Sequence, residues 1–190
     1  AICKSDFLMT GENPENIQGP CSSLSEDRYL DRKFDYMITN PPFGVSWKSE
    51  EDFIKNESKQ TNGRFTAGTP RTSDGSLLFL QNLISKMEPK GSRIGIVFNG
   101  SPLFVGDAGS GESEIRKWII ENDLLETVIM LPDKLFFNTH IATYIWILDN
   151  KKNKNRKNKI QMINAKDHCG FMKKKLGEKN KEISDACSHC

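Results

Sequence analysis

The chain has 190 residues, a length that suits one domain with a small appendage. Its residues are 36% hydrophobic and 27% charged, as in ordinary folded proteins, and no apolar run approaches the roughly 18 residues of a membrane span. A net charge of +2 gives no indication of a general polyanion-binding surface, and five irregularly spaced cysteines indicate a reducing, cytoplasmic setting rather than a disulfide framework.

The first nine residues form a short apolar stretch that predicts a strand with Asp6 near its end. Because the chain lacks an initiator Met and opens directly into this element, we expect it to be a fragment of a longer protein. Residues 10–31 are rich in Gly, Asn, Pro and Ser and predict a loop.

The stretch Phe34–Thr39 is apolar and β-prone, which predicts a buried strand. It stops at Asn40, and the next two residues, Pro41 and Pro42, fix φ near −65° and donate no backbone hydrogen bond. The result is a stiff turn that presents an amide, bare carbonyls and the ring of Phe43. Open α/β sheets bind ligands at this carboxyl end of their strands.

The rest of the chain alternates between helical and strand patterns. A long polar loop is predicted over 45–74, helices over 76–87 and 113–122, and strands over 93–98, 124–131, 141–148 and 160–165. The strands over 124–131 and 141–148 are close enough in sequence to pair antiparallel. Lys151–Lys159 is interpreted as a solvated loop, with phosphate contact the less favoured reading, and 167–190 as a helix or tail. The pattern predicts an α/β fold with a mostly parallel sheet and a terminal antiparallel strand.

The Asn-Pro-Pro-Phe turn suits chemistry on an amine attached to a flat ring. Such an amine is a poor nucleophile because its lone pair is delocalised. The side-chain oxygen of Asn40 and the carbonyl oxygen of Pro41 could accept its two hydrogens and favour the tetrahedral, nucleophilic form. Phe43 offers a face for stacking, worth roughly 1–3 kcal/mol per base. The alternative is a rigid turn without chemistry.

A strand followed by Asn-Pro-Pro-Phe resembles the catalytic motif of amino-methyltransferases that use S-adenosylmethionine. The wider order of motifs resembles the modification subunit of type I restriction–modification systems, from residue 1 to about 165. The likeness is carried by the segments 2–8, 33–48, 75–87, 93–98, 106–121 and 131–148.

The resemblance implies a Rossmann-like sheet and methylation of adenine N6 in DNA, with S-adenosylmethionine as cofactor. DNA, a specificity subunit and a restriction subunit would be the partners. The residues implied are Asn40, Pro41, Pro42 and Phe43 for activating the adenine, Asp6 and Phe7 with Asn40 for the cofactor, and Phe43 with Phe137, or less favoured Phe136, for stacking on the flipped base. Lys48, Arg64 and Arg71 are candidates for contacts with the DNA backbone, and a solvated loop is equally favoured.

The chain departs from the resembled pattern at its start. No glycine-rich turn precedes the catalytic strand, and Gly106–Gly111 lies too far downstream to replace it. We therefore expect residues 1–165 to be the catalytic half of a methyltransferase domain whose sheet is incomplete in its N-terminal half, and 166–190 to be a polar tail or the start of a helical region. In that arrangement residues 1–10 do not pair beside Phe34–Thr39.

Two further questions remain open from sequence. Free thiols in a frayed tail are favoured over a zinc site for the residues His168, Cys169, Cys187, His189 and Cys190. The alternatives for function are methylation of another planar amine, such as a glutamine side chain or an RNA base, and a fragment that docks partners without catalysis.

Overall fold

The computed structural model of the chain describes residues 2–137 and 141–183. Its main sheet contains β1 (Tyr36–Thr39), β2 (Arg93–Phe98), β3 (Leu125–Met130), β4 (Tyr144–Asp149) and β5 (Gln161–Asn164), and a separate hairpin contains β6 (Gly170–Leu176) and β7 (Lys179–Glu182). The helices are α1 (Ile2–Thr10), α2 (Glu51–Ser58), α3 (Ser76–Ile84), α4 (Ser101–Phe104) and α5 (Gly111–Glu121), with 3₁₀ turns η1 (Pro14–Asn16), η2 (Lys48–Glu50) and η3 (Lys154–Arg156). Among the helices so described, none is long and apolar enough to cross a membrane.

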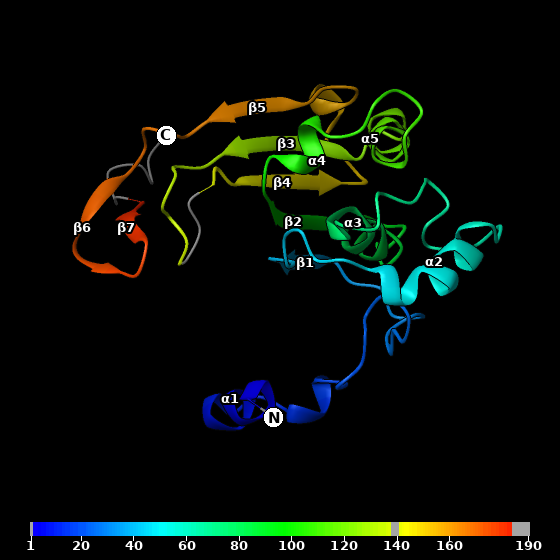
Figure 1. Cartoon of the computed structure of the whole chain (residues 1–190), viewed down its shortest axis with the longest axis horizontal. Coiled ribbons are helices and arrows are strands. Elements are labelled where there is room, and N and C mark those ends of the chain that lie inside the picture. Colours follow the sequence, from blue (N-terminus) through cyan, green and yellow to red (C-terminus); the bar gives the residue numbers. More distant parts are fainter. Residues whose placement is uncertain (1, 138–140, 184–190) are drawn as a thin grey trace.

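The main sheet has the strand order β1-β2-β4-β3-β5 (Figure 1). Four strands run in one direction, and β4 runs against both of its neighbours. The predicted α/β fold with a mostly parallel sheet is confirmed, and so is the antiparallel pairing of β3 with β4. The antiparallel strand lies inside the sheet and not at its border. The border at which the four parallel strands end is called the carboxyl edge below.

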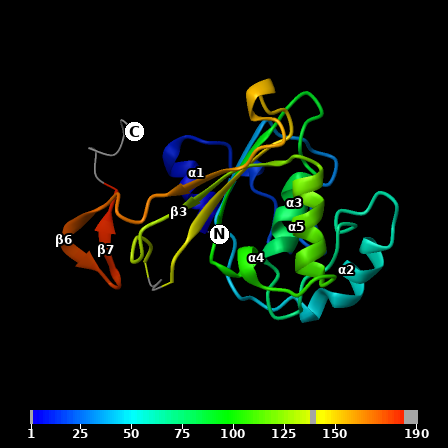
Figure 2. The same ribbon diagram turned by 90° about the horizontal axis from the view of Figure 1, so that it is seen from above.

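One face of the sheet is covered by α3 and α5, with α2 and α4 on the same side (Figure 2). Alternate residues of the strands point into this layer, because successive side chains of a strand face opposite sides. The core that they form with the helices includes Leu77, Leu80, Ile94, Ile96, Phe98, Ile115, Ile119, Trp146 and Leu148. At its centre the rings of Phe98 and Trp146 meet edge to face, with centroids 5.1 Å apart.

The opposite face of the sheet is aliphatic towards the carboxyl edge and carries charged residues, among them the ion pair Arg93–Asp149, at its other end. Register partners on four strands, Val97, Ile145, Ile129 and Ile163, form one aliphatic row across it. On β1, the side chain of Ile38 is 91% exposed. Helix α1 lies on this side of the sheet in Figure 2 but stands apart from it below β1 in Figure 1, so within the described residues no helix packs on this face.

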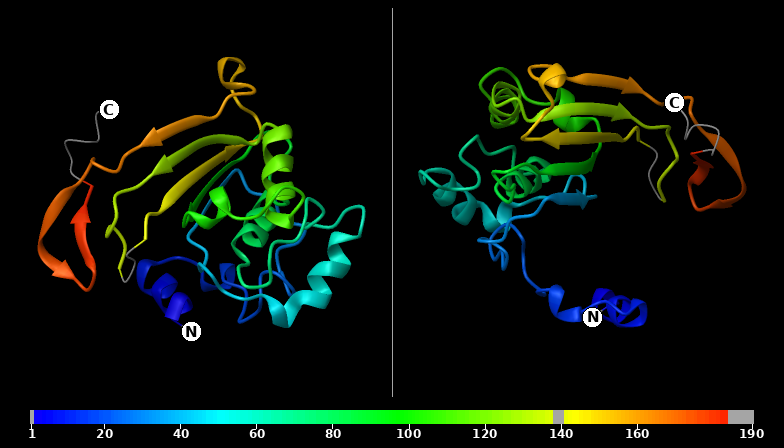
Figure 3. Two further views of the ribbon diagram at one scale, coloured as in Figure 1. Left: turned by 45° about the horizontal axis from the view of Figure 1, so that its top comes forward. Right: turned by 180° about the vertical axis from the view of Figure 1, so that it is seen from behind.

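The N-terminal residues form a helix, so the predicted strand over residues 1–9 is wrong. Helix α1 packs against η1 and lies beyond the free side of β1, apart from the sheet (Figures 1 and 3). A single short strand without a partner leaves its backbone groups unpaired, whereas a helix pairs them internally. Among the described strands β2 alone pairs with β1, so the prediction that residues 1–10 do not pair beside Phe34–Thr39 is confirmed.

Two further segments differ from the sequence-based expectation. The polar stretch 45–74 contains helix α2, which is anchored by the fully buried Ile54 and has two acidic residues in its first turn, where the helix dipole favours them. The segment expected as a helix or tail after residue 166 forms the β6–β7 hairpin. Its two-residue turn places Gly177 at φ 58°, a backbone conformation that glycine adopts without strain.

Candidate active site at the carboxyl edge

The Asn-Pro-Pro-Phe turn leaves the sheet at the carboxyl end of β1, as predicted. Within the turn, Pro41 is buried and Phe43 is half-buried. Asn40 is exposed, and in the part of the chain that the structure describes its amide has no hydrogen-bond partner. Gly44 follows at φ 63° and turns the chain back along the domain.

The segment that enters the turn is fixed by backbone and side-chain contacts. Strand β1 pairs in parallel with β2, from Tyr36 opposite Arg93 to Thr39 opposite Ile96. Just before it, Ser92 Oγ donates to the carbonyl of Phe34 at 2.6 Å. These contacts leave the position of Asn40 little freedom relative to the sheet.

The segment that leaves the turn is fixed as well. The carbonyl of Val45 accepts a hydrogen bond from Gly75 N at 3.0 Å, and Trp47 N donates to the carbonyl of Thr72 at 3.0 Å. The indole of Trp47 is buried, and its Nε1 donates to the carbonyl of Arg71 at 2.9 Å. The turn is therefore held at both ends while its amide faces solvent. This is the arrangement of a preorganised acceptor.

A pocket of about 260 Å³ opens beside the outgoing segment. It is lined by Cys21–Leu24, Val45–Trp47, Glu50, Gly75 and Phe79. Nothing in the sequence pattern indicated it, because residues 21–24 and Phe79 meet only in the folded chain. Small-molecule sites usually measure roughly 300–1,000 Å³, so this pocket alone is too small for a whole nucleoside cofactor.

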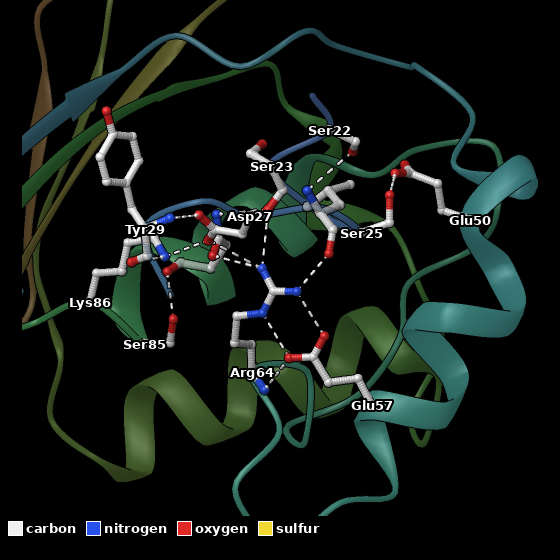
Figure 4. Close-up of polar contacts among 12 residues, drawn as sticks. Ser22, Ser23, Ser25, Asp27, Tyr29, Glu50, Glu57, Arg64, Ser85 and Lys86 are labelled. Carbon is white, nitrogen blue, oxygen red and sulfur yellow. Dashed lines mark hydrogen bonds and ion pairs between the residues drawn. The ribbon is translucent and has the colours of Figure 1, made fainter. Parts of the chain in front are cut away.

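Arg64 is buried and does not face solvent, which corrects its assignment as a candidate for DNA contact (Figure 4). Its side chain is only 6% exposed. Its Nε and Nη2 each donate to a carboxylate oxygen of Glu57 at 2.7 Å, and its Nη1 donates to Asn82 Oδ1 at 3.1 Å. The carbonyls of Ser23 and Leu24 accept two further hydrogen bonds from the guanidinium.

The Arg64 cluster comprises Arg64, Asp27, Glu57, Asn82 and Lys86. Asp27 forms ion pairs with both Lys86 and Arg64, and its side chain is 4% exposed. Burial raises the pKa of Glu57, but hydrogen bonds and charge from Arg64 outweigh burial, so this pKa lies below its ordinary value. The cluster fastens the loop before β1 to α2 and α3. Sequence gave no signal of it beyond the presence of the charges.

The other two basic candidates differ from Arg64. Lys48 is exposed. Arg71 is half-exposed and forms a long ion pair with Asp74, at 3.9 Å between Nη2 and Oδ2.

The loop after β3 carries the residues expected to stack on the base. It leaves the same carboxyl edge as Asn40, and Phe137 is 62% exposed while Phe136 is half-buried. In the strand order, β3 stands three places from β1, which puts the two strand ends about 14 Å apart. The structure therefore brings Phe43 and Phe137 to the same edge of the sheet, although β1 and β3, the strands that precede them, are not neighbours.

The residues expected at the cofactor lie elsewhere. Asp6 is exposed and Phe7 half-buried on α1, so the strand-end position assumed for Asp6 is wrong. The Gly106–Gly111 segment serves packing: Ser110 Oγ caps α5 through Ser113 N at 3.3 Å, and Gly111 lies directly on the backbone of Thr69. Of the Cys/His residues near the C-terminus, Cys187, His189 and Cys190 lie outside the described residues.

Comparison with known proteins gives a consistent family. The model of the family described as "N-6 DNA Methylase" matches residues 1–188. The HindI methylase subunit of Haemophilus influenzae, a type I restriction enzyme subunit, is 33% identical over 154 residues, 81% of this chain and 32% of its own length. The MjaVII methylase subunit of Methanocaldococcus jannaschii is 32% identical over 167 residues, 86% of this chain and 28% of its own length.

Solved structures agree. The methyltransferase subunit of a type I restriction–modification system from Streptococcus thermophilus superposes with a TM-score of 0.75 at 27% identity, covering 95% of this chain and 36% of that subunit. The EcoKI M protein shares the fold, with a TM-score of 0.56 at 22% identity over 83% of this chain and 30% of its own. The chain thus spans between about a quarter and a third of the length of the curated relatives it matches.

Proposed function

The chain belongs to the N-6 DNA methylase family, and from this premise we propose that it holds the target base in the transfer of a methyl group to adenine N6 in DNA. The observation that carries the proposal is the amide of Asn40. It is exposed at the carboxyl end of β1, it has no partner among the described residues, and the turn around it is fixed on both sides.

The proposed chemistry needs two acceptors at one nitrogen. The Oδ1 atom of Asn40 and the carbonyl oxygen of Pro41 accept the two hydrogens of the adenine amine, which turns its lone pair out of conjugation. The nitrogen would become cationic only as the new carbon–nitrogen bond forms and the bond between that carbon and the donor's sulfonium sulfur breaks, and it would then lose one proton to solvent. Acceptors that are already in place need no reorganisation as this charge develops.

Aromatic rings would hold the base outside the duplex. Flipping costs a few kcal/mol of lost stacking, and a ring that replaces the neighbouring bases recovers part of that cost. Phe43 at the turn and Phe137 on the loop after β3 are the proposed stacking residues. Both lie at the carboxyl edge, and Phe137 is exposed.

S-adenosylmethionine would supply the methyl group, and the described residues do not form a complete site for it. Asp6 and Phe7, proposed as its contacts, are on α1 beyond the free side of β1, and the pocket beside Val45 measures only about 260 Å³. Asp6, Phe7 and Asn40 stay the residues proposed for the methyl donor, and Asn40 also faces the reacting amine.

Partners are proposed from the relatives. Type I methylase subunits are named as parts of restriction enzymes, so a specificity subunit and a restriction subunit are the proposed protein partners, and DNA is the substrate. The division into a catalytic part over 1–165 and an appendage over 166–190 also stays a proposal. So does the cytoplasmic location.

A docking role without catalysis is the second candidate. Two surfaces support it: the aliphatic part of the sheet face that no described helix covers, and the side of β1 that no described strand pairs, because exposed apolar patches and open strand edges often bind partners.

The test is a methylation assay with a full-length protein that contains this sequence, in complex with its specificity subunit. Asn40→Ala is expected to lower kcat by about 10²–10³-fold while DNA affinity changes little, since one preorganised acceptor is lost. Asn62→Ala, at an exposed asparagine of the loop after α2, is the matched control. Full activity of Asn40→Ala, or methyl groups found on RNA or protein instead of DNA, would refute the proposal.

A further inference from the structure

The β6–β7 hairpin stands at the same edge of the molecule as the Asn40 turn. Strand β5 runs parallel to β3 and ends at Asn164, and the hairpin follows six residues later (Figure 1, orange and red). Strands β1 and β5 border the sheet on opposite sides, so their ends lie about 19 Å apart. The turn and the hairpin thus flank the carboxyl edge.

The hairpin is fastened to the loop that carries Phe137. The carbonyl of Lys134 accepts hydrogen bonds from Asn180 N at 3.2 Å and Lys181 N at 3.4 Å. Lys181 also forms an ion pair with Asp133, which raises the pKa of the lysine and lowers that of the carboxyl group. The hairpin therefore has a defined position beside this loop.

The hairpin carries more positive than negative charges, and several of its lysines have no ion-pair partner among the described residues. Between Gly170 and Glu182 there are five lysines and two glutamates. Lys173, Lys174 and Lys175 are consecutive and exposed, and within residues 2–137 and 141–183 they form no ion pair. Because side chains alternate along a strand, the three ammonium groups point to both sides of the ribbon.

Lys173 and Lys175 share one face of the ribbon, so their like charges repel, and a ligand of opposite charge would relieve that repulsion. Lysine is depleted in protein–protein interfaces, whereas it is a common contact of nucleic-acid phosphates. A two-stranded ribbon also fits the major groove of DNA, which is about 12 Å wide. The chemistry of the surface therefore favours a polyphosphate backbone over a protein partner.

We infer that the β6–β7 hairpin binds the phosphate backbone of the duplex beside the flipped adenine, through Lys173, Lys174 and Lys175. The inference rests on the proposed function, since it takes DNA as the substrate. Such contacts fix the position of the duplex relative to the Asn40 turn and carry no sequence information. They also make the affinity depend on salt, because each neutralised phosphate releases counterions.

The test compares two triple variants of the full-length methyltransferase complex. K173A/K174A/K175A removes three charges from the hairpin. K151A/K154A/K157A removes three exposed lysines from the loop after β4, at the opposite edge of the sheet, and is the matched control. Binding to a labelled duplex is measured by fluorescence anisotropy at salt concentrations between about 50 and 200 mM. Over this range, counterion release changes the affinity strongly.

The hairpin variant is expected to bind specific and non-specific duplexes more weakly by the same factor, with the slope of log K against log salt reduced by about 2–3. K173R/K174R/K175R, which keeps the charge, should restore affinity and slope, and the control triple should leave the slope unchanged.

An unchanged slope in the hairpin variant, or an equal change in the control, overturns the inference. Loss of subunit assembly with an unchanged slope also overturns it, because the hairpin would then be a protein contact. Failure of the proposed function is separate: it appears as a wild-type complex that binds DNA and does not methylate it, whatever the hairpin variants do.

Discussion

Arg64 joins three segments that are far apart in the sequence: the loop before β1, helix α2 and helix α3 (Figure 4). The planar guanidinium suits this role, because its five donors lie in a fixed fork and can reach carboxylate, amide and carbonyl oxygens together. Arg64 makes no contact with the Asn40 turn itself. It holds the loop that precedes β1 through the carbonyls of Ser23 and Leu24.

Replacement of Arg64 by Met is expected to lower the free energy of unfolding by about 3–5 kcal/mol, because the carboxylate of Glu57 stays buried without its partner. The shift in the urea midpoint of the chain measures this. Arg28→Met is the control: Arg28 pairs with Glu26 at the surface, and no shift is expected. A variant at position 64 as stable as the wild type would contradict the structural role of the cluster.

The same pair makes stability depend on pH. The pKa of Glu57 is lower in the folded chain than in the unfolded one, so its contribution is fully present above the unfolded value of about 4.3 and is lost as the pH falls towards the folded value. In a series of urea midpoints between neutral and acid pH, Glu57→Gln should lose this part of the acid dependence. An acid profile identical to that of the wild type would show that Glu57 does not contribute.

At the scale of elements, the start of α5 lies against the backbone of the loop after α2. A Cβ atom at Gly111 would stand 1.7 Å from the carbonyl oxygen of Thr69, closer than atoms can approach. Gly111→Ala is therefore expected to destabilise the chain by about 1–3 kcal/mol through overpacking. Gly170→Ala, where nothing lies within 4 Å, is the control in the same thermal or urea titration. Equal stability of the two variants would count against this close contact.

Elements with strong apolar patterns were predictable from sequence, and elements fixed by distant contacts were not. The strands Arg93–Phe98 and Leu125–Met130 were predictable because a short apolar run is by itself typical of a buried strand. Helix α2 was not predicted from the sequence, because it buries one residue, Ile54, and so has no apolar pattern of helical spacing. The β6–β7 hairpin was not predicted either, because consecutive lysines interrupt the alternation of apolar and polar residues that indicates a strand.

The candidate site divides in the same way. Asn40 and its prolines were predictable, because a local strand–turn motif specifies them. The role of Arg64 and the place of Asp6 depend on which segments meet in space, and the charges alone gave no information about that.

At the scale of the whole molecule, and within residues 2–137 and 141–183, helices cover one face of the sheet only and β1 is paired on one side only. In calorimetry, the 190-residue chain is expected to bind S-adenosylmethionine weakly or not at all, because no glycine-rich turn precedes β1 and the pocket beside the Asn40 turn measures only about 260 Å³. A full-length methyltransferase that contains the chain serves as the positive control. Micromolar affinity of the chain alone would show that its own residues suffice.

Strand β4 lies between β2 and β3, although β3 precedes it in the sequence. During synthesis, at about 5–20 residues per second, β3 leaves the ribosome before the strand that must join it to β2. Until residues 144–149 emerge, β2 and β3 have no common partner, and the places of Trp146 and Leu148 in the core are empty. Closure of this sheet is therefore a late event in the life of the nascent chain, and a polypeptide that stops before residue 144 leaves it in separate pieces.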